Sequence, residues 1–98
     1  MQINSKYINY TYSPLYNKRH FCNFVIMNIK EKIGIRLREL RKQKGLSQEK
    51  FAFECELDRT YIASIEQGKR NVSIVNIEKI TKALNIPLSE FFKSTLFN

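Results

Sequence analysis

Cationic and hydroxyl-bearing side chains gather in the stretch LDRTYIASIEQGKRN, which covers residues 57–71. On a helix, Ile62 and Ile65 share one face and would be buried together. The opposite face and the residues just past the helix would then carry the polar side chains Arg59, Thr60, Tyr61, Ser64, Lys69, Arg70 and Asn71. Arginine can bond O6 and N7 of guanine as a fork, the threonine methyl can meet thymine, and tyrosine can reach a phosphate. The stretch therefore has the chemistry to contact the major groove of double-stranded DNA, although an ordinary solvated helix face would carry similar residues.

Two short helices joined by a turn are predicted to position this face. Ser47 can cap the first of them, because a serine oxygen accepts a hydrogen bond from a free backbone N–H of the first turn. Its inner face would hold Phe51, Ala52 and Cys55. Asp58 can cap the second helix, which would run from position 59 to about 67 and stop at Gly68. This is a helix-turn-helix layout, in which the small Ala52 would let the two helices cross closely.

Three further helices would complete the fold. The first begins near Ile29 and ends at Gly45, and its apolar stripe is Ile33, Leu37 and Leu40. Ser73 as a cap and Asn85 as a left-handed stop bound the next helix. Its predicted core face is Ile74, Ile77, Ile80 and Leu84. Pro87 opens a last short helix. Because no run alternates with period two, we predict an all-α fold, a compact five-helix bundle.

The composition divides the chain into two parts. Residues 1–26 are rich in Asn and Tyr and contain no acidic residue, whereas from Met27 onward charged and aliphatic residues recur at helical spacing. We expect residues 27–98 to form one domain for DNA binding and dimerisation. Residues 1–26 would be a disordered or loosely docked extension, an arm reaching along DNA, or a mis-assigned start with translation beginning at Met27.

Charge, hydropathy and cysteine content limit the classes of function. The formal net charge is +8, from 17 Lys and Arg against 9 Asp and Glu, which favours a polyanionic partner. No window approaches about 18 uninterrupted apolar residues and the N-terminus lacks a signal-peptide pattern, so we expect a soluble cytoplasmic protein with no membrane partner. Cys22, Cys55 and His20 are too few for a zinc site, and Cys55 is expected to be a buried apolar residue. We expect no enzyme, cofactor or metal, because paired carboxylates and a phosphate-binding glycine loop are also missing.

Residues 34–92 resemble the phage-repressor/Cro-type helix-turn-helix family. GIRLRELRKQKGLSQEKFA is similar to the opening helices of that family, and ITKALNIPLSEFF is similar to its close. Within the family, LDRTYIASIEQGKRN looks most like the controller proteins of restriction–modification systems. These are small dimeric regulators that bind operators upstream of their own gene and of the endonuclease gene. The resemblance implies a lambda-repressor-like fold and a sequence-specific DNA-binding transcription regulator.

The resemblance also implies roles for individual residues. Arg59 and Thr60 match residues that meet base edges, and Tyr61 matches a residue near the backbone where the DNA is bent. Arg70 matches an arginine that contacts a base or a phosphate. Gln48 matches a glutamine whose side chain and backbone N–H address a phosphate, which suits the N-terminus of a helix.

The resemblance also concerns one ion pair and one turn that hold the helices in place. Arg41 and Glu66 match a buried ion pair that ties the first helix to the third. Glu56 occupies a turn position where the family commonly has Gly or Asn. If Glu56 must adopt a positive φ, the strain is about 1–2 kcal/mol; otherwise the turn is built differently.

Apolar side chains crowd the C-terminus and predict a dimer interface of Leu88, Phe91 and Phe92. One of the two adjacent phenylalanines can point into the core, and the other must face elsewhere. A two-fold dimer would present two recognition helices about 34 Å apart, so the expected partner is double-stranded DNA with an inverted-repeat operator. A contact with RNA polymerase is left open, as is the choice between activation and repression.

Two other functions stay open at the level of the sequence. A phage-type or antitoxin-type repressor would have the same fold. A protein-interaction module would use the helix-turn-helix domain as a docking platform and would not bind duplex DNA.

Overall fold

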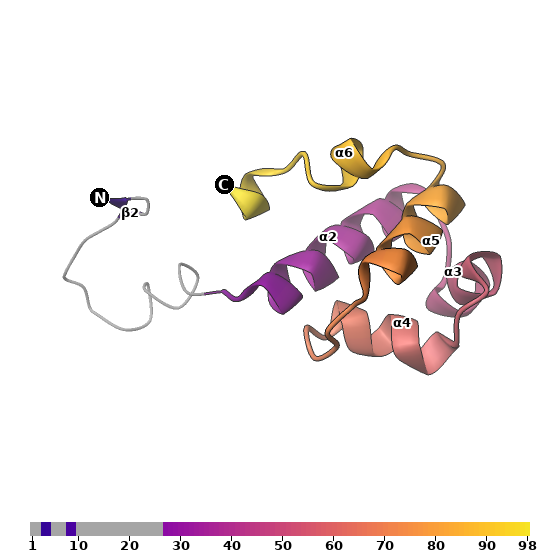
Figure 1. Cartoon of the computed structure of the whole chain (residues 1–98). Coiled ribbons are helices and arrows are strands. Elements are labelled where there is room, and N and C mark those ends of the chain that lie inside the picture. The colour runs from indigo at the N-terminus through magenta and orange to yellow at the C-terminus, as the bar shows by residue number, and fades with distance from the viewer. Residues whose placement is uncertain (1–2, 5–7, 10–26) are drawn as a thin grey trace.

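The computed structural model describes residues 3–4, 8–9 and 27–98 (Figure 1). Two short strands, β1 (Ile3–Asn4) and β2 (Ile8–Asn9), pair antiparallel with Ile3 opposite Asn9. The sequence does not predict this pairing, because a two-residue strand is too short to leave an alternating pattern. The rest of the predicted N-terminal extension lies outside the described residues, so its alternatives stay predictions.

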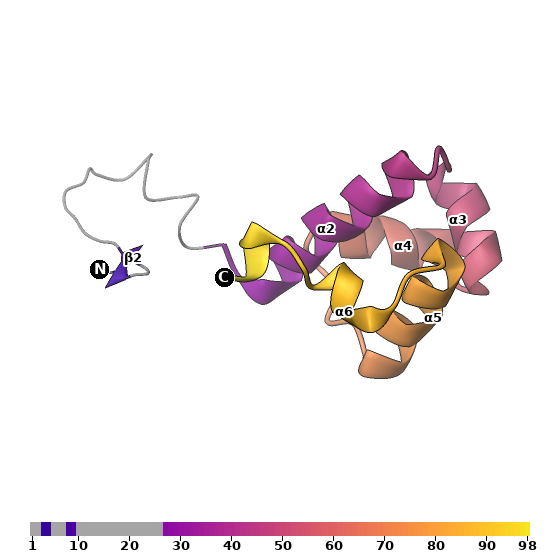
Figure 2. The ribbon, with the colours of Figure 1, turned by 90° about the horizontal axis from the view of Figure 1, so that it is seen from above.

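Five α-helices and one short 3-10 turn follow in the described part of the chain. They are α2 (Ile29–Gln43), α3 (Gln48–Cys55), α4 (Arg59–Glu66), α5 (Ile74–Leu84), α6 (Leu88–Phe91) and the 3-10 turn η2 (Thr95–Phe97). Figure 1 shows α2 through the middle, with α4 below it and α6 above it. Figure 2 shows the same molecule from above, and in both views η2 lies beside α2, which it contacts. The predicted five-helix, all-α fold is confirmed.

Side-chain caps begin the helices as the sequence predicts. Ser47, Asp58 and Ser73 each accept a hydrogen bond from a backbone N–H in the first turn of α3, α4 and α5. Asn28 caps α2 and forms a reciprocal capping box with Glu31, at 2.9 Å in both directions. Because each cap satisfies an N–H that has no partner inside the helix, the caps fix where the short helices begin.

Left-handed residues end two of these helices. Asn85 ends α5 with a φ of 60°, as predicted. Glu56 ends α3 with a φ of 59°, so the turn between α3 and α4 has the usual left-handed geometry with a side chain that fits it poorly. The strain of about 1–2 kcal/mol expected for such a residue is therefore present at Glu56.

The core lies where α2, α3, α4 and α5 meet. Its largest fully buried side chains are Phe51, Phe91, Leu37, Ile62, Ile65, Ile80 and Leu84. Cys55 is buried as predicted; burial raises the pKa of its thiol to about 12, and the nearby Glu54 carboxylate adds to the rise. Ile74 was expected in the core and this is wrong, because it is the first residue of α5 and is 69% exposed.

A glycine sets the distance between α2 and α4. A Cβ atom added at Gly34 would lie 2.3 Å from the carbonyl oxygen of Ile65, in the backbone of α4. A second glycine, Gly68, ends α4 with a φ of +75° and passes close to Glu31 of α2. The two helices therefore approach closely along the first half of α2, and any side chain at position 34 would push them apart.

We predict that Gly34→Ala destabilises the protein although alanine is the better helix former. The added methyl meets backbone that cannot rotate away, so the free energy of unfolding should fall by about 1–3 kcal/mol, as in overpacked cores. Urea unfolding followed by circular dichroism measures the change. Arg38→Ala, at an exposed position of the same helix, is the control and should change the free energy by less than about 0.5 kcal/mol. A Gly34→Ala protein as stable as the wild type would contradict the close approach.

Candidate nucleic-acid interface

The helix α4 presents one apolar face and one polar face. Ile62 and Ile65 are 0% and 1% exposed and belong to the core. Arg59 and Thr60, at the start of the helix, are exposed to solvent. Figure 1 shows α4 along the lower edge of the molecule, away from α6. The polar face predicted for this stretch therefore lies on the outside.

The cap of α4 orients Thr60. The Asp58 carboxylate accepts a hydrogen bond from the Thr60 backbone N–H at 3.1 Å and another from its hydroxyl. Thr60 is exposed, so its methyl group and its hydroxyl are both available for a base edge.

A second polar group lies around Tyr61, which is half-buried. The Arg70 guanidinium lies over the Tyr61 ring, with its carbon 4.8 Å from the ring centre. Arg70 Nε donates to Ser64 Oγ at 3.2 Å, and the Ser64 hydroxyl donates to the backbone carbonyl of Tyr61 at 2.8 Å. The Tyr61 hydroxyl accepts a hydrogen bond from Asn76 of α5 at 2.9 Å. Three of the predicted site residues thus meet, with Asn76 as a fourth member that sequence analysis missed.

The remaining predicted residues do not join this group. Lys69 and Asn71 are exposed in the segment between α4 and α5. Gln48 is the first residue of α3, and its side-chain Nε2 donates to Glu66 Oε1 at 3.0 Å. The Gln48 amide is therefore turned toward Glu66, while its backbone N–H lies at the N-terminus of the helix, where anions are favoured.

Arg41 and Glu66 form a nearly buried ion pair. Arg41 Nε and Nη2 donate to the two Glu66 oxygens at 2.6 and 2.9 Å, and the two side chains are 8% and 3% exposed. Arg41 Nη1 also donates to the carbonyl of Leu46 at 2.7 Å, in the loop between α2 and α3. The hydrogen bond to Glu66 raises the pKa of Arg41 against the opposing effect of burial. The pair holds α4 in a fixed position against α2.

A second buried arginine, Arg36, was missed by sequence analysis. Its Nε donates to the carbonyl of Phe91 at 2.7 Å, and its Nη2 donates to the carbonyls of Glu90 at 2.7 Å and Lys93 at 3.4 Å. Arg36 thereby binds the C-terminal end of α6 to α2. Its place beside Leu37, on the apolar stripe of α2, was a signal that could have identified it.

The predicted dimer interface needs one correction. Phe91 is fully buried in its own protomer, because its ring fills the core and its carbonyl is held by Arg36. It therefore contributes no exposed surface. Phe92 is half-buried and packs edge-on against Phe91 and Phe97, with 5.1 Å between ring centres in each pair. Leu88 is 38% exposed.

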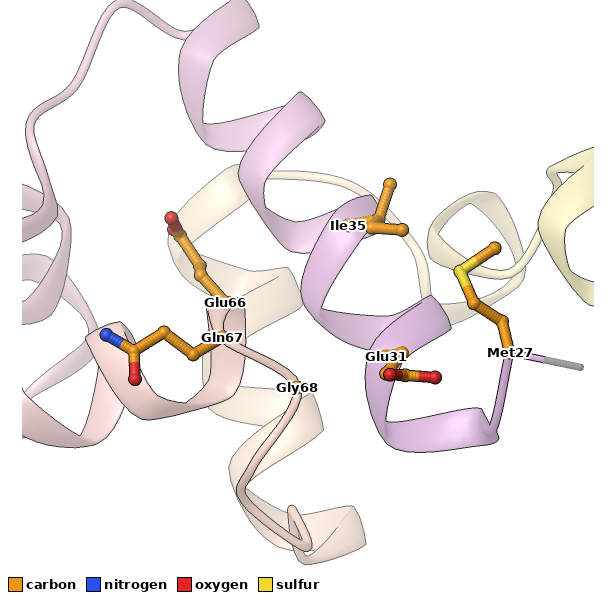
Figure 3. Close-up of a pocket in the computed structure, with 6 residues that line it drawn as sticks. All are labelled: Met27, Glu31, Ile35, Glu66, Gln67 and Gly68. Carbon is orange, nitrogen blue, oxygen red and sulfur yellow. The ribbon is translucent and has the colours of Figure 1, made fainter. Parts of the chain in front are cut away.

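A shallow pocket of about 210 Å³ lies where the end of α4 meets the start of α2. Figure 3 shows the residues that line it, and their polar ends point in different directions. A small-molecule site needs polar groups that converge on a ligand, and the polar groups around this pocket do not converge.

No helix in the described residues is long and apolar enough to cross a membrane.

Residues 37–91 match the helix-turn-helix family model. The control protein C.MunI of a Mycoplasma species is 59% identical over 66 residues, which are 66% of this chain and 89% of that protein. The chain belongs to the helix-turn-helix family of restriction–modification controller proteins. The controller protein C.AhdI of Aeromonas hydrophila has a similar crystal structure, with a TM-score of 0.63 at 56% identity over 64% of this chain and 91% of that one. C.Esp1396I, solved as a tetramer in complex with its natural 35 base-pair operator, has a TM-score of 0.62 at 38% identity over 65% of this chain and 84% of that one.

We predict that Glu66→Gln destabilises this controller protein, because it leaves the Arg41 charge buried without its partner. The expected loss in the free energy of unfolding is about 3 kcal/mol. Chemical denaturation measures it. The double variant Arg41→Met/Glu66→Met is the comparison and should lose less, since it buries no unpaired charge. If the double variant lost as much as Glu66→Gln, the unpaired charge would not be the cause.

Proposed function

We propose that this protein is a sequence-specific DNA-binding transcription regulator that controls a restriction–modification locus. The observation that carries the proposal is the solvent-exposed start of α4, with Arg59 and Thr60 outside and Ile62 and Ile65 inside, in a chain of the controller family. In this fold, the second helix of the motif enters the major groove with its N-terminal residues toward the bases. We propose that the protein binds DNA and catalyses no reaction, and that it acts in the cytoplasm, where the DNA lies.

The polar residues divide into two kinds of contact. We assign the reading of base edges to Arg59 and Thr60, since they stand on the first turn of α4 and are exposed. Tyr61 and Arg70, supported by Ser64, are assigned to the sugar-phosphate backbone or its nearest bases. We assign contacts with phosphates to the exposed Lys69 and Asn71 and to the backbone N–H of Gln48, at the N-terminus of α3. Backbone contacts fix the register of a protein on the duplex, and base contacts discriminate sequence.

Net charge supplies the part of the affinity that does not depend on sequence. The chain carries a formal net charge of +8. Each phosphate neutralised by a lysine or arginine releases counterions, so binding to any duplex should weaken as salt increases. Discrimination would come from the few base contacts, at about 1–3 kcal/mol for each good bidentate pair.

Two copies of the protein are needed to read an operator. One short helix reaches few base pairs, and a two-fold dimer places two such helices about one DNA turn, or 34 Å, apart. We propose that the contact between the copies uses the exposed apolar side chains of α5 and α6. These are Ile74 at 69% exposure, Val75 at 61% and Leu88 at 38%. The half-buried Phe92 follows four positions after Leu88.

Arg59→Ala should change how well the protein discriminates between DNA sequences, whereas Lys69→Ala should change its affinity for any duplex. Removing Arg59 should reduce the difference in binding free energy between the operator and a random duplex by about 1–3 kcal/mol, because a base contact is lost. Removing Lys69 should weaken both duplexes alike and reduce the salt slope by about one. Fluorescence anisotropy titrations at several salt concentrations measure both effects. An unchanged ratio in Arg59→Ala would show that Arg59 does not read the operator.

Charges placed on the proposed dimer contact should produce monomers. Leu88→Glu or Val75→Glu would bury a carboxylate between the copies, where an unpaired charge is costly. Light scattering should show a shift from dimer to monomer, and operator affinity should fall with it because only one half-site is held. Phe53→Glu is the matched control, since Phe53 is 83% exposed on α3 and should leave the dimer intact. A dimer that persists in both α5 and α6 variants would place the contact elsewhere.

A further inference from the structure

Asn76 connects α5 to the polar face of α4. It lies in the first turn of α5, where its backbone N–H is held by Ser73 at 3.1 Å, so the cap fixes the backbone from which its side chain extends. From there, Asn76 Nδ2 donates to the Tyr61 hydroxyl at 2.9 Å, fifteen positions earlier in the chain. Asn76 and Tyr61 are both half-buried, which shields this hydrogen bond from competing water.

The direction of this hydrogen bond decides what Tyr61 can offer. A phenol has one hydrogen to donate and lone pairs to accept with. Because the Asn76 amide donates to the Tyr61 oxygen, the phenol keeps its own hydrogen for an outside acceptor. The acceptor that a duplex presents along its backbone is a phosphate oxygen.

The Tyr61 ring also supports Arg70. The guanidinium lies over the ring face, 4.8 Å from its centre, and Ser64 holds the Arg70 Nε. With Nε engaged, the two outer nitrogens of the guanidinium remain as donors. The Tyr61 hydroxyl thus contacts Asn76, and the Arg70 guanidinium contacts Ser64 and the Tyr61 ring. These contacts are present in the protein without DNA.

We infer that Asn76 is a positioning residue of the DNA-binding face. It fixes Tyr61 so that the phenol hydrogen and the Arg70 guanidinium are both directed at the phosphate backbone. The inference rests on the proposed function and goes beyond it in naming a residue that acts on the DNA-binding face through Tyr61. Ordering these groups in the free protein removes an entropic cost that binding would otherwise bear.

A double-mutant cycle on operator binding tests the inference. The probe is a duplex that the wild-type protein selects from a randomised library, compared with a random duplex of the same length. Asn76→Ala should weaken binding to the selected duplex about fivefold, the size expected for one positioned hydrogen bond. Tyr61→Phe should weaken it at least as much. Adding Asn76→Ala to Tyr61→Phe should produce no further loss, because a residue that acts through the phenol has nothing left to act on.

Two additional variants control for folding. Asn85→Gly removes an asparagine at the opposite end of α5, where a φ of 60° suits glycine, and should leave the affinity unchanged. Asn76→Asp keeps a short polar side chain, and an acidic residue is favourable in the first turn of a helix, so this variant should fold. Its carboxylate would accept the phenol hydrogen and repel the phosphate, so the loss of affinity should exceed that of Asn76→Ala.

The outcomes separate this inference from the proposed function. A wild-type protein that enriches no duplex would overturn the proposed function itself. A wild-type protein that binds its selected duplex, with Asn76→Ala costing as much in the Tyr61→Phe background as alone, would overturn only the inference. Operator binding of Asn76→Asp at the wild-type level would overturn it too.

Discussion

The Arg41–Glu66 ion pair is the contact on which the geometry of the DNA-binding face depends. Glu66 is the last residue of α4, and it accepts hydrogen bonds from Arg41 of α2 and from Gln48 at the start of α3. Arg41 in turn holds the loop between α2 and α3 through the carbonyl of Leu46. Three helices and one loop are therefore joined at a single pair of charges. Such a pair adds little net stability over an apolar core of the same shape, but it permits only one arrangement of its donors and acceptors. Its contribution is orientation.

The helix α2 also positions α6, on the side of the molecule opposite α4. One turn and a half before Arg41, Arg36 binds the end of α6 through three backbone carbonyls. Carbonyls at the end of a helix lack partners within it, so a buried guanidinium satisfies several of them at once. Both α4 and α6 are tied to α2. The position of α2 therefore determines the placement of the surface proposed to read DNA and of part of the surface proposed to join two copies. Gly34 keeps the first half of α2 close to α4.

Local sequence signals predicted most of the fold, because the signals are themselves local. Ser47, Asp58 and Ser73 cap the helices that follow them, and Asn85 ends α5, since each acts on backbone within a few residues. The burial of Ile62 and Ile65 followed from their spacing. Spacing alone failed at Ile74, because the apolar stripe of α5 begins one turn later than the helix. Whether Glu56 would adopt a left-handed conformation was left open, since a poor residue for a turn can also indicate a different turn.

Contacts between distant residues were the part that the sequence could not supply. The choice between Phe91 and Phe92 for the core depends on how Arg36 holds α6, fifty-five positions away from Phe91. The sequence did not identify Asn76 as a site residue, because its partner Tyr61 is on another helix and its own neighbours, Val75 and Ile77, are apolar. A resemblance to a family supplied residues that touch DNA, whereas the residues that hold those residues in place emerged only from the three-dimensional contacts.

Cys55 has a consequence for how the protein would respond to oxidative stress. Peroxides and disulfides attack the thiolate form, and burial with a neighbouring carboxylate raises the pKa of this thiol to about 12. At neutral pH the sulfur is therefore protonated and enclosed between α3 and the rest of the core. Oxidation at this position is therefore disfavoured, because little of the thiolate that oxidants attack is present. The domain is thus insulated at Cys55 from the redox state of its surroundings.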